Sequence, residues 1–365
     1  MIIVKRFWEY LAKELLSTRA FTEYDNKDST TLLSRINAIS AKAERNRERI
    51  NAISAKAEQN RERIRHPFFP PAKMYSYMES ESFTIEQKKW FINKRGWPNL
   101  GYWQNLDNPK SFNEKTNWYK LHYRDPLITE CIDKYRFKDY VRRTIGEEYV
   151  VPLVGRGMYE SIEDIDFNEL PESFVLKSTW GSGSRHVIIV RDKSKIDENQ
   201  TKMTMSEWIL PWENVYYETL DWGYKDIEPR IISEELIKNK IVEYKVFCFD
   251  GVPKFLYIAK DSAPGLRNRR DFYSTDWEWL PVKRGSENFS ERQPRPKNLD
   301  TILGLSRKLS APFPHVRVDI VDTENGLLAE ELTFYTGSGE HAFEPEEWDL
   351  KFGEFFNLPT ENLVF

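Results

Sequence analysis

The sequence is poor in the residues that form covalent staples or zinc sites. Its 365 residues include two cysteines and five histidines, and Cys131 and Cys248 lie far apart along the chain. These counts exclude a disulfide framework and a zinc cluster, and they favour a reducing, cytoplasmic setting. No apolar run approaches the roughly 20 residues of a membrane-spanning helix. Residues 1–21 lack the cleavage site of a signal peptide, so none is expected.

The sequence also lacks an excess of basic residues. Lys and Arg number 54 against 58 Asp and Glu, which gives a formal net charge of −4. A dedicated nucleic-acid binder normally carries a basic surplus, so no nucleic-acid partner is expected. The 31% of charged and 40% of hydrophobic residues are typical of a globular protein with a charged surface.

The N-terminal part contains two helical patterns. Residues 2–21 place apolar side chains at helical spacing, which predicts an amphipathic helix within segment 1–28 that packs on protein. Peripheral contact with an anionic membrane is the alternative, since basic residues occupy other positions. Residues 36–49 and 50–63 then repeat each other except at Arg45 and Gln59.

This repeat of two heptads places Ile, Ala and Asn at positions a and d and predicts a coiled coil over residues 29–66. Extended back to Ser29, its seam would span about 54 Å of helix. Ile at both core positions favours three strands, so we expect a homo-oligomer, a dimer or a trimer. A single solvated helix is the alternative.

Proline-rich residues 66–71 end any helix and mark a domain boundary. The following pattern is mostly helical up to residue 149, with turns predicted at 96–99 and 108–111. Strand-like runs dominate from residue 150, so the fold class expected is α+β rather than repeated parallel βαβ units. We predict a helical part over 67–170, a central subdomain over 171–240 and a C-terminal subdomain over 241–365. The strands are expected at 174–177, 186–190, 230–237, 244–249, 255–259, 316–321 and 327–334.

A glycine-containing loop follows the first of these strands. The strand ends in Lys177, the loop Gly181–Ser184 follows, and a second apolar run returns. Glycines let backbone amides approach a phosphate closely, and Lys177 would add a fixed positive charge. There is no Walker A pattern. An ordinary hairpin turn is the alternative.

Three further segments add charged groups. Asp133 and Lys134 lie in a predicted helix over 132–138, whose cations would otherwise form a solvated face. Residues 229–237 form an apolar strand with two acids near its end, where backbone groups could meet a purine edge. Asp319 and Glu331 lie on strands joined by a turn at residues 325–326, so they should face each other across the ribbon. Such oxygens suit Mg²⁺, and a plain cross-strand pair is the alternative.

In this order the segments resemble the ATP-grasp superfamily, and more closely its TupA-like branch, which is associated with teichuronopeptide and surface-polysaccharide synthesis. The resemblance runs from about Leu100 to Pro359 and also includes residues 105–115, 170–177, 243–245 and 331–334. It implies an ATP-grasp fold, in which two α+β subdomains sandwich ATP. The N-terminal 70 residues lie outside it.

The resemblance also implies roles for individual residues. Lys134 and Lys177 would contact the α- and β-phosphates, and the glycine-containing loop would close over the phosphates. The acidic end of the strand at 229–237 would meet adenine and ribose. Lys245 would reach the γ-phosphate or an acyl phosphate. Many superfamily members have Asn where this chain has Thr333, a weaker magnesium ligand. The implied sites are Lys134 and Lys177 for the phosphates; Trp180, Gly181, Ser182, Gly183 and Ser184 for the loop; Glu234, Glu235 and Leu236 for the nucleoside; Lys177 and Lys245 for catalysis; and Asp319, Glu331 and Thr333 for magnesium.

The function implied is that of an ATP- and Mg²⁺-dependent, ADP-forming carboxylate–amine ligase, which activates a carboxylate as an acyl phosphate for attack by an amine or amino acid. The carboxylate could belong to a uronic acid of a surface polysaccharide. The alternatives are a kinase for a sugar hydroxyl, a glycosyltransferase-associated enzyme of capsular polysaccharide synthesis, and a non-enzymatic coiled-coil scaffold. Two basic segments could bind the anionic acceptor or could be solvated loops; they contain Arg267, Arg269, Arg270, Arg292, Arg295 and Lys297.

Overall fold

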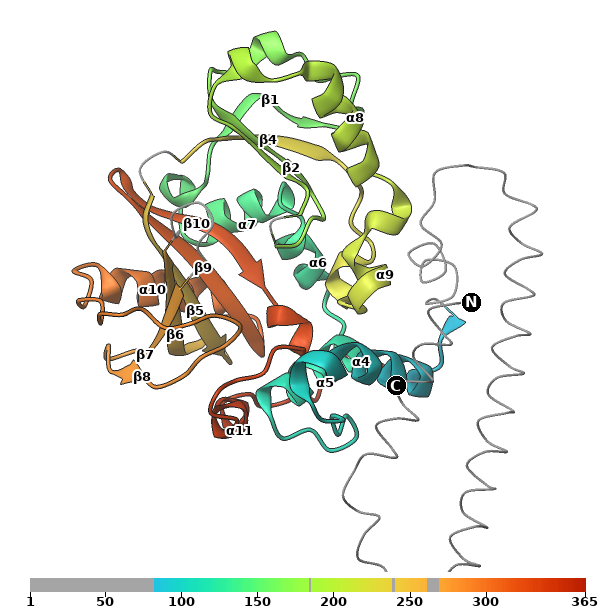
Figure 1. Ribbon diagram of the computed structural model, residues 1–365, viewed down its shortest axis with the longest axis vertical. Coiled ribbons are helices and arrows are strands. Elements are labelled where there is room, and N and C mark those ends of the chain that lie inside the picture. Colours follow the sequence, from blue (N-terminus) through green and yellow to red (C-terminus); the bar gives the residue numbers. More distant parts are fainter. Residues whose placement is uncertain (1–81, 184, 238–239, 261–268) are drawn as a thin grey trace, which may run out of the picture. The chain divides into compact units, whose positions relative to one another are not determined.

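The computed structural model describes residues 82–183, 185–237, 240–260 and 269–365, which belong to one compact unit (Figure 1). The amphipathic segment predicted over 1–28 and the coiled coil predicted over 29–66 lie outside the described residues. None of the described helices is long and apolar enough to cross a membrane.

Helices dominate the first described part, as the sequence pattern predicts. A capping box between Thr84 and Gln87 starts the first helix. The turn predicted at 96–99 is wrong, because this helix continues to Leu100 with Pro98 in its last turn. The missing proline amide costs little so close to the end, which Gly101 sets with a φ of 75° and an N–H donated to the Trp97 carbonyl. The four α-helices are α4 (Ile85–Leu100), α5 (Phe112–His122), α6 (Pro126–Ile132) and α7 (Arg136–Thr144).

A four-stranded antiparallel sheet forms the upper part of the view in Figure 1, with strand order β1-β4-β2-β3. Phe174, Leu176 and Ile231 are fully buried and pack with Met205 and Trp208 of α8. The sheet includes β1, so it does not begin at the boundary drawn at residue 171. Its elements are β1 (Leu153–Tyr159), β2 (Phe174–Ser178), β3 (Val187–Val190) and β4 (Ile231–Glu235), with α8 (Glu198–Trp208) and α9 (Val215–Thr219) between β3 and β4.

A six-stranded antiparallel sheet follows, with strand order β10-β9-β5-β6-β7-β8. The hairpin predicted with its turn at residues 325–326 is present between the last two strands, but the turn residues are 324–325 and Gly326 already begins the last strand. All seven predicted strands are present, with ends shifted by a few residues. Its elements are β5 (Lys240–Phe249), β6 (Val252–Lys260), β7 (Arg269–Ser274), β8 (Trp279–Leu280), β9 (His315–Thr323) and β10 (Gly326–Thr333), with α10 (Leu299–Ser310) before β9 and α11 (Glu347–Glu354) after β10.

Alternation along β5 assigns the two faces of this sheet. The Cys248 thiol points to Ser306 of α10, so its face packs on that helix. Phe247, one residue earlier, packs on the opposite face against Phe112 of α5. Lys245 is two residues before Phe247 and therefore lies on the side away from α10.

The segment 105–115, quoted for the family resemblance, is structural. Glu114 accepts hydrogen bonds from the backbone amides of Asn105, Lys110 and Ser111, at 2.8 to 3.1 Å. Farther along α5, Lys120 is 1% exposed and donates to the carbonyls of Thr219 and Ser338. These contacts fasten α5 to segments on both sides of it.

Candidate active site

Two lysines share one buried carboxylate beneath the glycine-containing loop. Lys177, the penultimate residue of β2, places its ammonium 2.6 Å from one oxygen of Glu234 on the neighbouring strand β4. Lys138 on α7 lies 2.7 Å from the other oxygen and also donates to the Val151 carbonyl. Burial alone would raise the pKa of Glu234, but the two ammoniums outweigh it and lower that pKa to about 2. Burial opposes the charged form of Lys177, but Glu234 outweighs it and raises the pKa of the lysine.

Lys134 lies at the junction of α6 and α7, and not on a helix as predicted. The Asp133 carboxylate accepts the backbone N–H groups of Tyr135 and Arg136 at the start of α7, and the Asp133 backbone N–H donates to the Thr129 carbonyl at the end of α6. Arg230 holds the other Asp133 oxygen at 3.0 Å. The Lys134 ammonium donates to the carbonyl of Gly181 in the loop, and burial lowers its pKa.

The loop residues differ in what they can offer a ligand. Trp180 is buried and its indole N–H donates to the Trp208 carbonyl, so its side chain belongs to the core and is not free to cover a nucleotide. A Cβ at Gly181 would lie 2.9 to 3.0 Å from His186 and Arg185 atoms, so only glycine fits there. Gly183 has a φ of 62° and open space around it. Ser182 lies by the Tyr224 hydroxyl, and Ser184 falls outside the described residues.

The two acidic residues at the end of β4 have different surroundings. Glu234 is buried and turned to the two lysines, so its carboxylate is not aimed at a nucleoside. Glu235 is exposed, and its backbone N–H donates to the Pro152 carbonyl at 2.9 Å. Leu236 follows the strand and is half-buried.

The second group of charges lies on the six-stranded sheet, where Glu331, Asp319 and Lys245 are register partners on β10, β9 and β5. Arg317 forms a two-point contact with Asp319, at 2.7 and 2.6 Å, and donates to the Thr333 hydroxyl at 2.9 Å. Lys245 also donates to Asp319. Burial opposes the charged form of Lys245, but Asp319 outweighs it and raises the pKa of the lysine above its usual range.

Asp319, Glu331 and Thr333 supply two carboxylates and a hydroxyl, the hard oxygen donors that Mg²⁺ prefers, so the residue set fits magnesium. Asp319 is already neutralised by two cations, and this leaves Glu331 as the less encumbered carboxylate. Within the described ranges, no group of three His, Cys, Asp or Glu side chains could hold a metal ion by itself.

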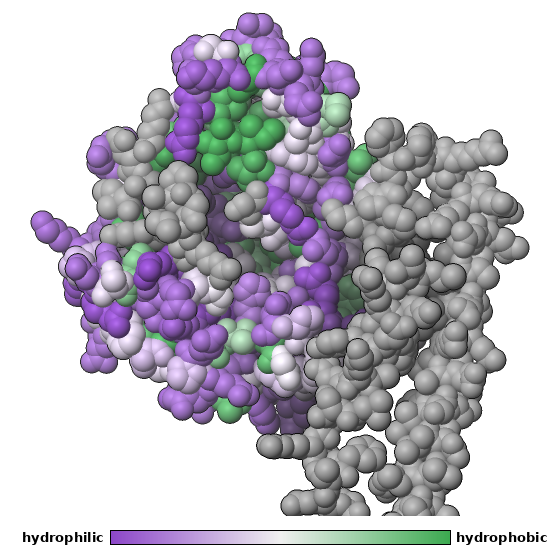
Figure 2. Space-filling view, in the orientation of Figure 1, coloured by the Kyte–Doolittle hydropathy of each residue, from purple (hydrophilic) through white to green (hydrophobic). Residues whose placement is uncertain are grey.

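The two groups of charges act on each other across the space between the sheets. Glu331 opposes the lowering of the Lys134 pKa and contributes to the raising of the Lys177 pKa. It also raises the pKa of Tyr224, together with burial, which is the larger cause. Figure 2 shows apolar side chains gathered over the four-stranded sheet and a hollow in the surface below them, toward the six-stranded sheet. The sequence-predicted lysines and carboxylates thus converge.

Two residues of this site escaped the sequence reasoning. Lys138 receives no role in the sequence analysis, where a solvated face is the alternative for its segment, but it is 5% exposed and bound to Glu234. Its position four residues after Lys134 was the available signal. Arg317 stands two residues before Asp319, so both side chains share a face of β9, and that spacing could have identified it.

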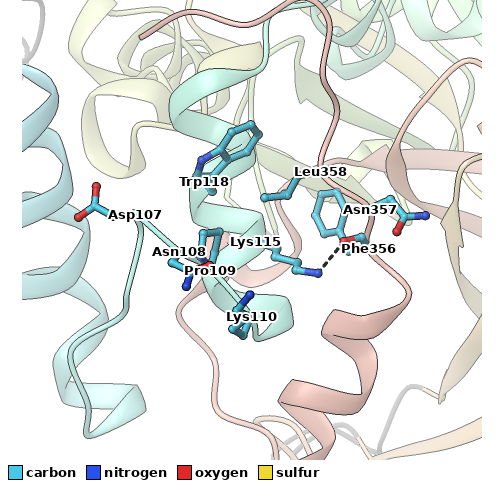
Figure 3. A pocket seen from close by; sticks show the side chains of 9 residues that line it. All are labelled: Asp107, Asn108, Pro109, Lys110, Lys115, Trp118, Phe356, Asn357 and Leu358. Carbon is cyan, nitrogen blue, oxygen red and sulfur yellow. Dashed lines mark hydrogen bonds between the residues drawn. The ribbon is translucent and has the colours of Figure 1, made fainter.

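A separate groove of about 460 Å³ lies beside the start of α5 and contains none of the predicted site residues (Figure 3). The half-buried Lys115 donates at 2.9 Å to the carbonyls of Gly353 and Phe356 and thereby caps the end of α11. The lining residues are Asp107, Asn108, Pro109, Lys110, Lys115, Trp118, Phe356, Asn357 and Leu358.

Two antiparallel sheets with helices, and charged groups that face each other between the sheets, define an α+β class of fold, and comparison with known families specifies the family. The sequence model of the TupA-like ATP-grasp family matches residues 114–357, two thirds of the chain. The chain therefore belongs to the TupA-like ATP-grasp family.

Solved structures of ATP-grasp enzymes are similar at low identity. D-alanine–D-alanine ligase from Bacillus anthracis is 19% identical, with a TM-score of 0.36 over 56% of this chain and 57% of that chain. D-alanyl-alanine synthetase A from Vibrio cholerae is 12% identical, with 0.35 over 61% and 63%. N5-carboxyaminoimidazole synthase from Aspergillus clavatus is 12% identical, with 0.33 over 60% and 46%. The match thus spans about half to two thirds of these proteins. Comparison with the curated proteins finds no match.

Proposed function

We propose that this chain is an ATP- and magnesium-dependent ligase that phosphorylates a carboxylate and joins the resulting acyl phosphate to an amine, releasing ADP and phosphate. The observation that carries the proposal is the convergence of Lys177 from the four-stranded sheet, Glu331 from the six-stranded sheet and Lys134 from the junction of α6 and α7. Membership of the ATP-grasp family supports it.

The cations suit a reaction that moves negative charge. Lys134 and Lys177 would donate to phosphate oxygens beside the loop, where Lys134 already meets the Gly181 carbonyl. Lys245, held charged by Asp319, would stabilise the charge on the transferring phosphoryl group. No covalent protein nucleophile is required, and the two buried cysteines have raised thiol pKa values that fit a structural place.

Glu331, Asp319 and Thr333 would hold magnesium at the edge of β9 and β10. When bound, the ion supplies neutralisation of phosphate charge without a proton transfer. Arg317 fixes the orientation of Asp319 through its two-point contact and so organises this edge.

The acceptor that we propose is the carboxylate of a uronic acid in a surface polysaccharide. The TupA-like affiliation favours a glycan, and the basic composition near β7 favours an anion. Product analysis distinguishes this from a sugar kinase: a ligase consumes an amine and leaves an amide, whereas a kinase leaves a stable phosphoester.

The test uses calorimetry of Mg·ATP binding to the full chain and to two variants, Lys134→Met and Lys177→Met. A hydrogen bond to a charged group contributes about 1.5–3 kcal/mol, so each variant should bind on the order of 10- to 100-fold more weakly. Lys138→Met is the matched control, since it removes the other ammonium from Glu234 and its amine already has a second acceptor in Val151. Unchanged affinity in both test variants, or an equal loss in the control, refutes the assignment.

A further inference from the structure

Five of the six basic residues noted in the two polar segments can be set aside, because partners are visible or the position is not described. Arg292 lies 3.4 Å from Asp271 and stacks on Trp279, and Arg295 pairs with Asp300 at 2.9 Å. Arg269 is exposed and bonds a backbone carbonyl. Lys297 makes no hydrogen bond or ion pair with the described residues that would direct it toward the site, and Arg267 lies outside the described residues. Arg270 differs from all of these.

Arg270 lies on the same sheet face as the charged residues of the site. It is the register partner of Ala259 on β6, and Ala259 pairs with Glu243 on β5. Glu243 is two residues before Lys245, so Arg270, Glu243 and Lys245 all point away from α10. The Arg270 guanidinium lies over the Tyr257 ring, 5.3 Å from its centroid, and Tyr257 pairs directly with Lys245.

A second arginine, Arg284, reaches the same place from the segment after β8. It is 4% exposed, and its guanidinium donates at 2.9 Å to the Thr336 carbonyl and lies 4.7 Å from the centroid of the Phe343 ring. Arg270 donates to the backbone carbonyl of Arg284 at 3.2 Å. A Cβ at Gly337 would lie 3.2 Å from the Arg284 guanidinium, so the glycine at this position keeps the space beside the guanidinium free of a side chain.

These two guanidiniums lack an anion within the described part of the chain. No described carboxylate lies within ion-pair distance of either, and the Nε atoms of both are buried without a hydrogen-bond partner. The buried Thr336 hydroxyl beside Arg284 also has no partner. Asp349 lies near Arg284, but its oxygens accept from Asn113 and Tyr102 at 2.9 to 3.0 Å.

The local charge balance is therefore positive. Arg270, Arg284, Arg317 and Lys245 give four cations here, and the carboxylates on this face are Asp319, Glu243 and Glu331, so one positive charge among these residues is uncompensated. Buried charge without a counterion is costly, and a guanidinium fork matches the two oxygens of a carboxylate or phosphate.

We propose that Arg270 and Arg284 form an acceptor subsite that binds an oxyanion of a sugar substrate next to Lys245 and Asp319. The proposal rests on the proposed function, because it places the acceptor beside the phosphoryl-transfer groups. The shared chemistry is two oxygens on one planar or tetrahedral centre, which a uronate carboxylate and a sugar phosphate both provide.

The experiment measures binding by calorimetry to the full chain in the presence of Mg²⁺ and a non-hydrolysable ATP analogue. The probes are D-glucuronate, glucose 1-phosphate and, as the neutral reference, D-glucose. The variants are Arg270→Gln, which is half-buried and tolerates the change, and Arg284→Lys, which keeps the charge but removes the fork. Arg269→Gln is the matched control, since it is adjacent to Arg270 and lies on the opposite face.

We expect one anionic sugar to bind the unmodified chain at least tenfold more tightly than glucose. Arg270→Gln and Arg284→Lys should each lose at least tenfold in that affinity, and the control should stay within twofold. Glucuronate binding identifies a carboxylate source and glucose 1-phosphate binding a phosphate source; either supports the subsite. Unchanged affinity in both variants, or no preference over glucose, overturns it. Retained ATP-analogue binding then shows that only the subsite has failed, whereas absent analogue binding overturns the proposed function.

Discussion

Replacing Glu234 by Gln removes the carboxylate that forms ion pairs with both Lys177 and Lys138. The side chain of Glu234 is 6% exposed, and the two contact distances are 2.6 and 2.7 Å. Removing one partner of a buried ion pair costs about 3–5 kcal/mol, because the remaining charge stays buried without compensation. The pKa of Glu234 gives an independent figure. A fall from its ordinary value of 4.5 to about 2 corresponds to about 3 kcal/mol of folding free energy at pH 7.

The sign of the pH dependence follows from that depressed pKa. The unfolded chain binds a proton at Glu234 near pH 4.5 and the folded chain only near pH 2, so this contribution is complete above pH 4.5 and is lost as the pH falls toward 2. The difference in unfolding free energy between the original chain and Glu234→Gln should decrease from about 3 kcal/mol at pH 7 to about 2 kcal/mol at pH 3.5.

Urea denaturation followed by tryptophan fluorescence measures both values. Glu235→Gln is the control, because Glu235 is the next residue along β4 and is exposed; its unfolding free energy should change by less than about 0.5 kcal/mol. A loss below about 1 kcal/mol in Glu234→Gln at pH 7, or a difference that does not shrink in acid, would refute the view that one carboxylate holds both lysines.

Three further predictions follow from other parts of the molecule. Glu331→Gln should abolish ADP formation at any attainable Mg²⁺ concentration, whereas Asp319→Asn should also lower the melting temperature, since it strips two cations of their partner; full turnover of both variants at low Mg²⁺ would move the metal elsewhere. Burial lowers the pKa of His315 to about 3, so the original chain should lose about 2 kcal/mol of stability between pH 7.5 and 5 that a His315→Gln variant does not lose; parallel urea-denaturation curves at the two pH values would contradict this. Deleting residues 29–65, which make up nearly all of the coiled coil predicted over 29–66, should reduce the oligomer mass in light scattering while ATP binding persists, and an unchanged subunit number would rule out that segment as the oligomerising element.

Much of the fold could be predicted because its signals are local. Alternating apolar runs marked the strands, and the dipeptide at residues 325–326 fixed the hairpin that brings Asp319 and Glu331 into register. The strand–loop pattern placed Lys177 beside the loop, whereas only the family resemblance connected Lys134 with the same phosphates, and in the structure Lys134 donates to Gly181 of that loop.

The remainder depends on contacts that no local pattern encodes. Lys138 looks like any exposed helical lysine until β4 brings Glu234 to it. The sequence pattern around Trp180 predicts a loop that covers a ligand. In the structure the indole N–H of Trp180 instead donates to the carbonyl of Trp208, at the end of a helix distant in the sequence. The unpaired state of Arg284 arises only when β7, the segment after β8 and the turn at Thr336 meet.

Lys120 on α5 has a consequence for how this sequence can change over evolution. Its ammonium meets Thr219, Asp221 and Ser338 at 2.7 to 3.1 Å, and these residues come from two segments more than 110 positions apart in the chain. Substituting Lys120, Asp221 or Ser338 alone would leave each of the other two side chains short of one hydrogen-bond partner. Substitutions at these three positions should therefore occur together. In a set of related sequences these three columns would therefore co-vary, and the polar identity of α5 would persist even where the glycine-containing loop diverges.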